Sequence, residues 1–133
     1  MTNASGNSAS ILGTGSTSLA LNQLTLRCVD MPTTAFGFFL TSRVQGMIGQ
    51  PGGSLGVLCL GGAIGRYVGP GQILNSGGAG EISLLLDLTM VPQPTGFVTV
   101  LPGETWNFTT WFRDNAGGQA TSNFSNGVSL DFL

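Results

Sequence analysis

The side chains best suited to bind a ligand lie along the alternating segment of residues 104–113. Successive side chains of an extended strand point to opposite faces, so Trp111 lies on the face away from the apolar side chains of this segment. Three polar side chains share its face: Asn107, Thr109 and Arg113. An exposed aromatic ring stacks against a sugar ring, and amide, hydroxyl and guanidinium groups beside it supply directional hydrogen bonds. The spacing therefore predicts a carbohydrate-binding site centred on Trp111.

A purely structural role for Trp111 stays open. The ring is equally able to pack under a loop or the N-terminal segment, or against Arg113 as a cation–π pair. A second exposed aromatic candidate is Tyr67, which follows Arg66 in the glycine-rich residues 62–71. This stretch has no Gly-Lys-Ser/Thr ending and no helical pattern after it, so it does not predict a phosphate-binding loop.

Catalytic chemistry is limited by the residue types that the chain lacks. Its 133 residues include no His and no Lys, which removes the usual general base, the commonest zinc and haem ligand and the Schiff-base amine. Only six carboxylates are present, and we expect them on turns and outward faces rather than paired for glycoside hydrolysis. We therefore expect a protein that is not an enzyme and has no cofactor.

The charge pattern narrows the range of partners. Four scattered Arg and a formal net charge of −2 do not provide the clustered cations that nucleic acid binding requires. The chain has no apolar run of the roughly 18 residues that a membrane span needs, so we expect no membrane insertion. Low charge with outward Thr and Asn instead favours contacts with glycans, with a surface protein or with further copies of the chain.

Two further pairs of residues have alternative interpretations. Asp114 and Asn115 offer oxygen ligands at a turn and make a weak calcium candidate, although Asx-turn hydrogen bonding accounts for the same residues. Cys28 and Cys59 are the only cysteines. A disulfide between them closes a loop of about 30 residues and stabilises by roughly 3–4 kcal/mol in the chain-entropy model. Two buried free thiols fit the sequence equally well.

Strands must position these side chains, because period-two alternation recurs between turn signals and helical periodicity is almost absent. We expect the glycine-rich residues 45–56 to form a long loop. Seven or eight short strands at this spacing predict an all-β fold, a two-sheet antiparallel β-sandwich of the immunoglobulin-like or jelly-roll-like kind. The clearest expected strands are residues 24–29, 36–42, 57–60, 81–88, 97–100, 104–113 and 128–132.

The sandwich is expected to occupy residues 19–133, preceded by a distinct segment over residues 1–18. This segment is rich in Ser, Asn, Gly and Thr around the apolar pair Ile11 and Leu12. It is either a flexible leader or an edge strand over residues 11–14. Such a strand joins the chain's own sandwich or, by strand exchange, that of a neighbouring subunit.

Three motifs are distinctive: Gly65-Arg66-Tyr67, the strand over residues 106–114, and Ser-Asn-Phe-Ser at residues 122–125. They resemble a module found near the C-terminus of large secreted proteins from planctomycetes and related environmental bacteria. The resemblance extends over approximately residues 22–132, and the Trp-Arg-Asp strand is its most distinctive part. It implies an extracellular bacterial β-sandwich appended to other domains, with no assigned chemistry.

These observations lead to two expected functions. The first is a non-catalytic extracellular module for attachment or adhesion, which binds glycan through Trp111 and its neighbours. The alternative is a self-assembling subunit of a surface fibre or layer, a homo-oligomer formed by exchange of residues 1–18. Either protein is secreted or lies at the cell surface. Because residues 1–10 lack the basic and apolar regions of a signal peptide, we expect that signal on a longer precursor.

Overall fold

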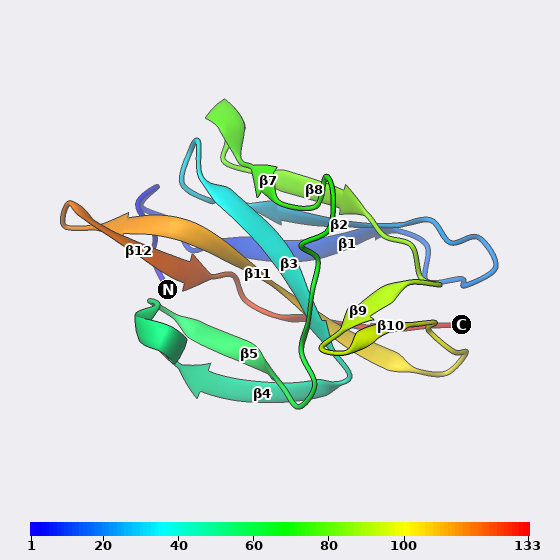
Figure 1. The fold of residues 1–133 in the computed structure, drawn as a ribbon. Coiled ribbons are helices and arrows are strands. Elements are labelled where there is room, and N and C mark those ends of the chain that lie inside the picture. The colour runs from blue at the N-terminus through cyan, green and yellow to red at the C-terminus, as the bar shows by residue number, and fades with distance from the viewer.

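Thirteen β-strands follow one another along the chain (Figure 1). The structure, a computed structural model, describes residues 1–133 and contains two short 3₁₀ helices, η1 (Pro51–Gly53) and η2 (Gly77–Ala79), but no α-helix. No helix is long and apolar enough to span a membrane. The strands are β1 (Ser10–Gly15), β2 (Leu24–Val29), β3 (Phe36–Ser42), β4 (Val44–Gly49), β5 (Val57–Gly61), β6 (Gly65–Arg66), β7 (Leu74–Asn75), β8 (Ile82–Leu85), β9 (Val91–Gln93), β10 (Gly96–Val98), β11 (Thr105–Ala116), β12 (Gln119–Phe124) and β13 (Val128–Asp131).

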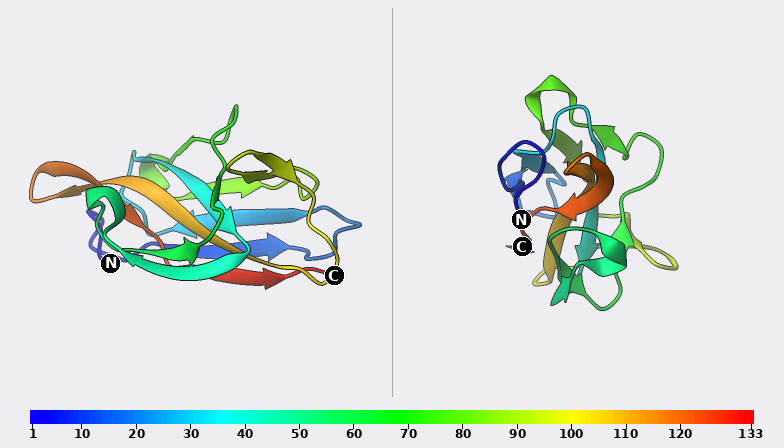
Figure 2. Two further views of the ribbon diagram at one scale, coloured as in Figure 1. Left: turned by 60° about the horizontal axis from the view of Figure 1, so that its bottom comes forward. Right: turned by 90° about the vertical axis from the view of Figure 1, so that its left-hand side faces the viewer.

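Two antiparallel sheets form the body of the molecule, which confirms the predicted all-β sandwich (Figures 1 and 2). The smaller sheet has the strand order β1-β2-β8. The larger sheet has the order β12-β11-β3-β6, with β13 also paired to β11 and β7 to β3. The main core contains apolar side chains from both sheets, including Leu26 of the smaller sheet and Phe39 and Phe108 of the larger one. Burial of this shared interior holds the two sheets together.

The structure has more sheets than the two predicted. β4 and β5 form a separate hairpin that packs on the outer face of the larger sheet, the face turned away from the main core. β9 and β10 form another two-stranded sheet. The prediction of a long loop over residues 45–56 is wrong at β4, which is a strand. The sequence does not indicate this strand, because most side chains of β4 are exposed and show no alternation of burial. Only its pairing with β5 defines it as a strand.

The hairpin is held by a second, smaller core, which we call the outer core. It contains four buried side chains: Leu40, Leu58, Leu60 and Phe124. Leu58 and Leu60 come from β5, whereas the other two come from β3 and β12 of the larger sheet. The larger sheet therefore has an apolar cluster on each face, and the outer face is only partly covered.

The central strand β11 has the predicted division between its two faces. Trp106, Phe108, Thr110 and Phe112 are all fully buried, as expected for the inner face. One edge of β11 pairs with β3, whereas the other pairs first with β13 and then with β12. Because it has partners along both edges, β11 is a rigid support for the side chains on its outer face.

The N-terminal segment forms an edge strand of the chain's own smaller sheet. β1 pairs with β2 over its whole length, and Ala9 and Ile11 are buried in the main core. Its other edge meets the connection between β12 and β13, where Asn126 Oδ1 accepts a hydrogen bond from the Ile11 amide at 2.9 Å. The Leu133 amide donates to the Thr17 carbonyl at 3.1 Å. Residues 9–17 are therefore integrated into the sandwich.

The two cysteines are free thiols on different sides of the larger sheet. Cys28 is fully buried in the main core between the sheets, whereas Cys59 is half-buried on β5, in the hairpin over the outer face. Of the two alternatives left by the sequence, the structure has the unbridged one. The sheet between the two residues explains why they do not meet.

Candidate binding groove

The register of the larger sheet brings aromatic and basic side chains together on its outer face. Directly opposed residues of neighbouring strands point to the same face. Trp111 of β11 lies opposite Phe38 of β3 and Phe124 of β12, which makes an aromatic row across three strands. In the row on one side of it, Leu40 of β3 lies opposite Arg66 of β6. Strand pairing thus places Trp111 and Arg66 on one surface.

Trp111 is half-buried and has a close neighbour on each side. Its ring stacks on that of Phe38, with centroids 5.0 Å apart and an interplanar angle of 30°. The Arg113 guanidinium carbon lies 5.1 Å from the Trp111 ring centroid, within the range of a cation–π contact. The cation–π pair considered as a structural alternative is therefore formed. It does not bury the ring, which still lines an open groove.

This groove has a volume of about 590 Å³ and runs between the outer face of the larger sheet and the η1 end of the hairpin. Its lining is mostly apolar. Phe38, Leu40, Trp111 and Phe124 of the larger sheet form the floor, and Leu58 of the hairpin and Ile64 lie beside it. Polar groups come from Arg66 and from the hydroxyls of Ser54 and Ser122. An apolar floor with a few polar groups at its border is the usual composition of a small-ligand site.

The wall of the groove is fastened to the sheet. The hydroxyls of Ser54 and Ser122 are hydrogen-bonded to each other, and the Leu55 amide donates to the Ser122 carbonyl at 2.7 Å. These contacts join the segment after η1 to β12. The protein's own hydrogen bonds therefore hold the wall of the groove against the sheet.

Two of the predicted site residues, Asn107 and Thr109, do not reach the groove. Both are buried. Asn107 donates from Nδ2 to the Ser42 carbonyl at 3.1 Å and accepts at Oδ1 from the Ser129 hydroxyl. The Thr109 hydroxyl donates to the Ser125 carbonyl at 3.2 Å. Strand parity places them correctly on the outer face, but the hairpin and the β12–β13 connection cover this part of it, so the expectation of exposed ligand-binding groups is wrong here.

The prediction that Tyr67 is exposed is also wrong. Its side chain is only 2% exposed and belongs to the main core. Gly65 is buried, and a Cβ there would lie 1.8 Å from the Pro92 carbonyl oxygen, so β9 passes directly over this residue. Arg66, between them, points outward, and alternation then turns Tyr67 inward. Burial raises the pKa of the Tyr67 phenol, and Asp87 adds to this effect.

Asp114 and Asn115 use their side-chain oxygens within the protein. Asp114 is buried and accepts from the amides of Ala4 and Asn115, at 2.9 and 2.8 Å, and from Asn123 Nδ2 at 3.1 Å. Asn115 Oδ1 accepts from the Gly118 amide at 3.0 Å. The Asx-turn interpretation of these residues therefore accounts for their contacts. No group of three or more His, Cys, Asp or Glu side chains is placed to hold a metal ion.

The side chains that sequence reasoning missed are those that complete the groove. Phe38 was expected on the same face as Leu40, but its contact with Trp111 depends on the pairing of β3 with β11. The local pattern of either strand does not contain that pairing. The wall formed by η1 and Leu58 was missed because the hairpin was expected to be a loop followed by an isolated strand.

No protein-family model, no curated protein and no solved structure matches the chain.

Proposed function

We propose that the protein is a non-catalytic attachment module that binds carbohydrate in the groove beside Trp111. The observation that carries the proposal is the aromatic row on the floor of an open groove with hydrogen-bonding groups at its border. The C–H groups of a sugar ring pack against aromatic and aliphatic surface, and its hydroxyls need donors and acceptors at the edge. The groove offers both.

The polar border suits hydroxyl recognition. Arg66 has five N–H donors in a planar fork, and the mutually hydrogen-bonded hydroxyls of Ser54 and Ser122 keep acceptor lone pairs at the border of the groove. Arg66 is exposed and makes no ion pair shorter than 4.0 Å, so its donors are free to bind a ligand. The volume of about 590 Å³ lies within the usual range of small-ligand sites.

The rigidity of the groove supports binding as its role. Trp111 and Phe38 come from the two central strands of the larger sheet, and their mutual stacking restricts both rings. Side chains that are already ordered lose little conformational entropy when a ligand binds. A rigid aromatic surface at the edge of a covered region therefore favours recognition without a large rearrangement.

The chemistry of the groove favours attachment over catalysis. The chain has no His or Lys to act as a general base, and no Asp or Glu lines the groove. The resemblance to modules of large secreted proteins supports a location outside the cell. We therefore propose a role in adhesion, at the cell surface or as part of a secreted protein.

A glycan array probed with the wild-type chain tests this function. Trp111→Ala is expected to lose binding because it removes the centre of the groove floor. Phe97→Ala is the matched control, since Phe97 is an aromatic side chain 64% exposed on β10 and does not line the groove. Binding to no glycan, or equal binding by Trp111→Ala and wild type, overturns the proposal.

A self-assembling surface subunit is the second candidate, favoured by the exposed apolar side chains of the edge strand β4. Val44, Met47 and Ile48 are 52%, 85% and 45% exposed. An exposed apolar edge strand is a template for pairing with another chain. Assembly by exchange of residues 1–18 requires β1 to break its six register pairs with β2 of its own chain. Light scattering during size-exclusion chromatography decides, and a monodisperse monomer at all concentrations argues against assembly.

A further inference from the structure

The four arginines of the chain fall into two classes. Arg27 forms an ion pair with Glu81, with Nη2 and Oε2 2.8 Å apart. Arg43 forms one with Glu104, with Nε and Oε2 3.6 Å apart. Arg66 and Arg113 form no ion pair at all. In a chain with only four cations and six carboxylates, half of the positive charges are left without a partner.

The two unpaired arginines lie on the same surface. Arg113 is two residues after Trp111 on β11, with its guanidinium over the indole ring. Arg66 lies opposite Leu40, in the row on the other side of the aromatic pair, and lines the groove. The row of Trp111 and Phe38 is therefore flanked by one free cation in each direction along the strands.

No carboxylate oxygen lies within 4.0 Å of the guanidinium nitrogens of Arg66 or Arg113. None of the residues that line the groove is Asp or Glu. Asp114, the neighbour of Arg113 in sequence, points to the opposite face of β11 and is engaged by Asn123 and by backbone amides. Asp87, which lines another pocket together with Arg66, accepts hydrogen bonds from the Thr89 hydroxyl at 2.6 Å and from Asn22 Nδ2, but it forms no ion pair with Arg66. The surface around Trp111 therefore has two cations, Arg66 in the groove and Arg113 beside it, and no carboxylate is paired with either, on a chain whose net charge is −2.

We propose that the ligand of the groove is an acidic polysaccharide, one whose sugars carry carboxylate or sulfate groups. This inference rests on the proposed carbohydrate-binding function and names its substrate class. A guanidinium binds planar carboxylate and sulfate oxygens through paired, charge-assisted hydrogen bonds. The apolar floor takes the sugar ring, and Arg66 and Arg113 take the acidic substituents.

The spacing of the two arginines favours a chain of sugars over a single one. Their rows are separated by four residues along the strands, or about 14 Å of backbone at roughly 3.4 Å per residue. Arg113 already turns its guanidinium toward Trp111, so one sugar ring on the aromatic row contacts both guanidinium groups only if Arg66 also turns toward it. Consecutive sugars of a polysaccharide reach both.

Non-specific attraction does not account for such binding. A net charge of −2 repels a polyanion at long range, so attraction requires the local pair of cations. Salt is therefore expected to weaken the binding only as much as about two ionic contacts allow. The affinity is expected to depend on where the arginines lie and not on how many the chain has.

Calorimetric titration with matched polysaccharides tests the inference. The probes are dextran with dextran sulfate, and fully methyl-esterified polygalacturonate with polygalacturonate. Each pair shares a backbone, and the two pairs separate the sulfate from the carboxylate source. Wild type is expected to bind an acidic member at least about tenfold more tightly than its neutral partner. Arg66→Gln and Arg113→Gln are each expected to remove about threefold of that preference, so that the two contributions together account for it.

Arg27→Gln is the control, because it removes the same charge from the smaller sheet, where Arg27 is paired with Glu81. It is expected to bind like wild type, and circular dichroism checks that all three variants are folded. Equal binding of neutral and acidic polysaccharides overturns the inference and leaves the carbohydrate function standing. An equal loss in Arg27→Gln overturns it in favour of bulk electrostatics. Binding to none of the probes overturns it, and the glycan array then separately decides the carbohydrate function.

Discussion

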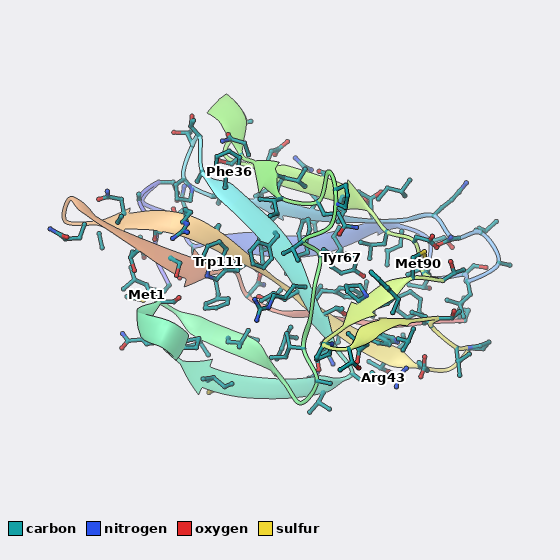
Figure 3. The ribbon with its side chains drawn as sticks, viewed as in Figure 1. Met1, Phe36, Arg43, Tyr67, Met90 and Trp111 are labelled. Atoms are coloured by element: carbon teal, nitrogen blue, oxygen red, sulfur yellow. The ribbon has the colours of Figure 1, made fainter.

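The two tryptophans of β11, Trp106 and Trp111, have similar partners and different surroundings. Figure 3 labels Trp111 together with Arg43, the arginine that lies over Trp106. Each has a guanidinium over its ring, Arg43 at 4.8 Å from Trp106 and Arg113 at 5.1 Å from Trp111. Trp106 is fully buried, donates from Nε1 to Glu104, and its arginine is paired with the same carboxylate. Trp111 is half-buried, and its arginine has no acidic partner.

This difference separates a structural pair from a binding pair. Around Trp106 every charge is compensated within the protein, so the cluster contributes to stability and has no group left for a ligand. Around Trp111 the apolar surface is only partly covered, and the guanidinium of Arg113 has no acidic partner. The difference arises from what covers each face. The smaller sheet, together with β9 and the segments beside it, covers the inner face, whereas a two-stranded hairpin covers only part of the outer face.

The largest expected effect distinguishes the two tryptophans by stability. Trp106→Ala is expected to lower the free energy of unfolding by about 3–5 kcal/mol, the usual cost of truncating a fully buried aromatic. Trp111→Ala is expected to cost only about 1–2 kcal/mol, because its ring is half-exposed and packs in a small cluster. Urea unfolding measures both, and equal losses would contradict the assignment of Trp111 to a binding surface.

The inner face also carries a titratable group whose burial is testable by pH. Burial raises the pKa of the Cys28 thiol from its ordinary value of 9.0 to about 11. Below pH 9 the thiol keeps its proton in both the folded and the unfolded state, and the free energy of unfolding is at its full value. As the pH rises to 11 the unfolded chain loses this proton first, because the folded-state pKa is the higher one, so the free energy of unfolding falls. The two-unit difference corresponds to about 3 kcal/mol.

Stability measured from pH 8 to 11 by urea unfolding checks this expectation. Tyr67 contributes a decline of the same sign above pH 10, because burial raises its pKa as well. Cys28→Ala therefore serves as the control: it keeps the tyrosine contribution and loses the thiol contribution. A decline between pH 9 and pH 10 that is as steep in Cys28→Ala as in wild type would show that the thiol is not buried as described.

The outer core predicts a smaller and more local effect. Leu60→Ala is expected to cost about 2 kcal/mol, near the lower end for a buried Leu, because the cluster around it is small. The loss should loosen β4 and β5 and leave β1 and β2 intact. Amide hydrogen exchange resolves the two regions, and faster exchange spread evenly over all strands would mean that the hairpin is part of the main cooperative unit.

The smallest expected effect compares the two arginines. Arg43→Gln removes both a cation–π contact and an ion pair and is expected to cost about 1–2 kcal/mol. Arg113→Gln removes only a cation–π contact at an exposed position, expected to contribute about 0.5–1 kcal/mol. Thermal unfolding of both variants ranks them, and a larger loss for Arg113→Gln would indicate a structural role for that side chain.

The strand pattern predicted most of the inner face. The expected strands over residues 24–29 and 104–113 each have one fully buried face, which contains Leu26, Cys28, Trp106, Phe108 and Phe112. Such a face leaves a period-two signal in the sequence. The all-β class follows from the same signal.

The outer face was predictable only in part, since its burial depends on contacts between distant segments. Asn107 and Trp111 have the same parity, yet one is buried by the hairpin and the other borders the groove. Residues of β4 are exposed and carry no alternation, so nothing local indicated the hairpin. Tyr67 was misassigned because the close passage of β9 over Gly65 is a tertiary contact.

The indole N–H resonances of the two tryptophans test the central claim most directly. Short galacturonate and galactose oligosaccharides are added to isotope-labelled protein, with Trp111→Ala used to assign the two signals. A saturable shift of the Trp111 resonance with an unchanged Trp106 resonance is the predicted result, since Trp106 is buried and bonded to Glu104. No shift of Trp111 with either oligosaccharide, or equal shifts of both tryptophans, would contradict the account.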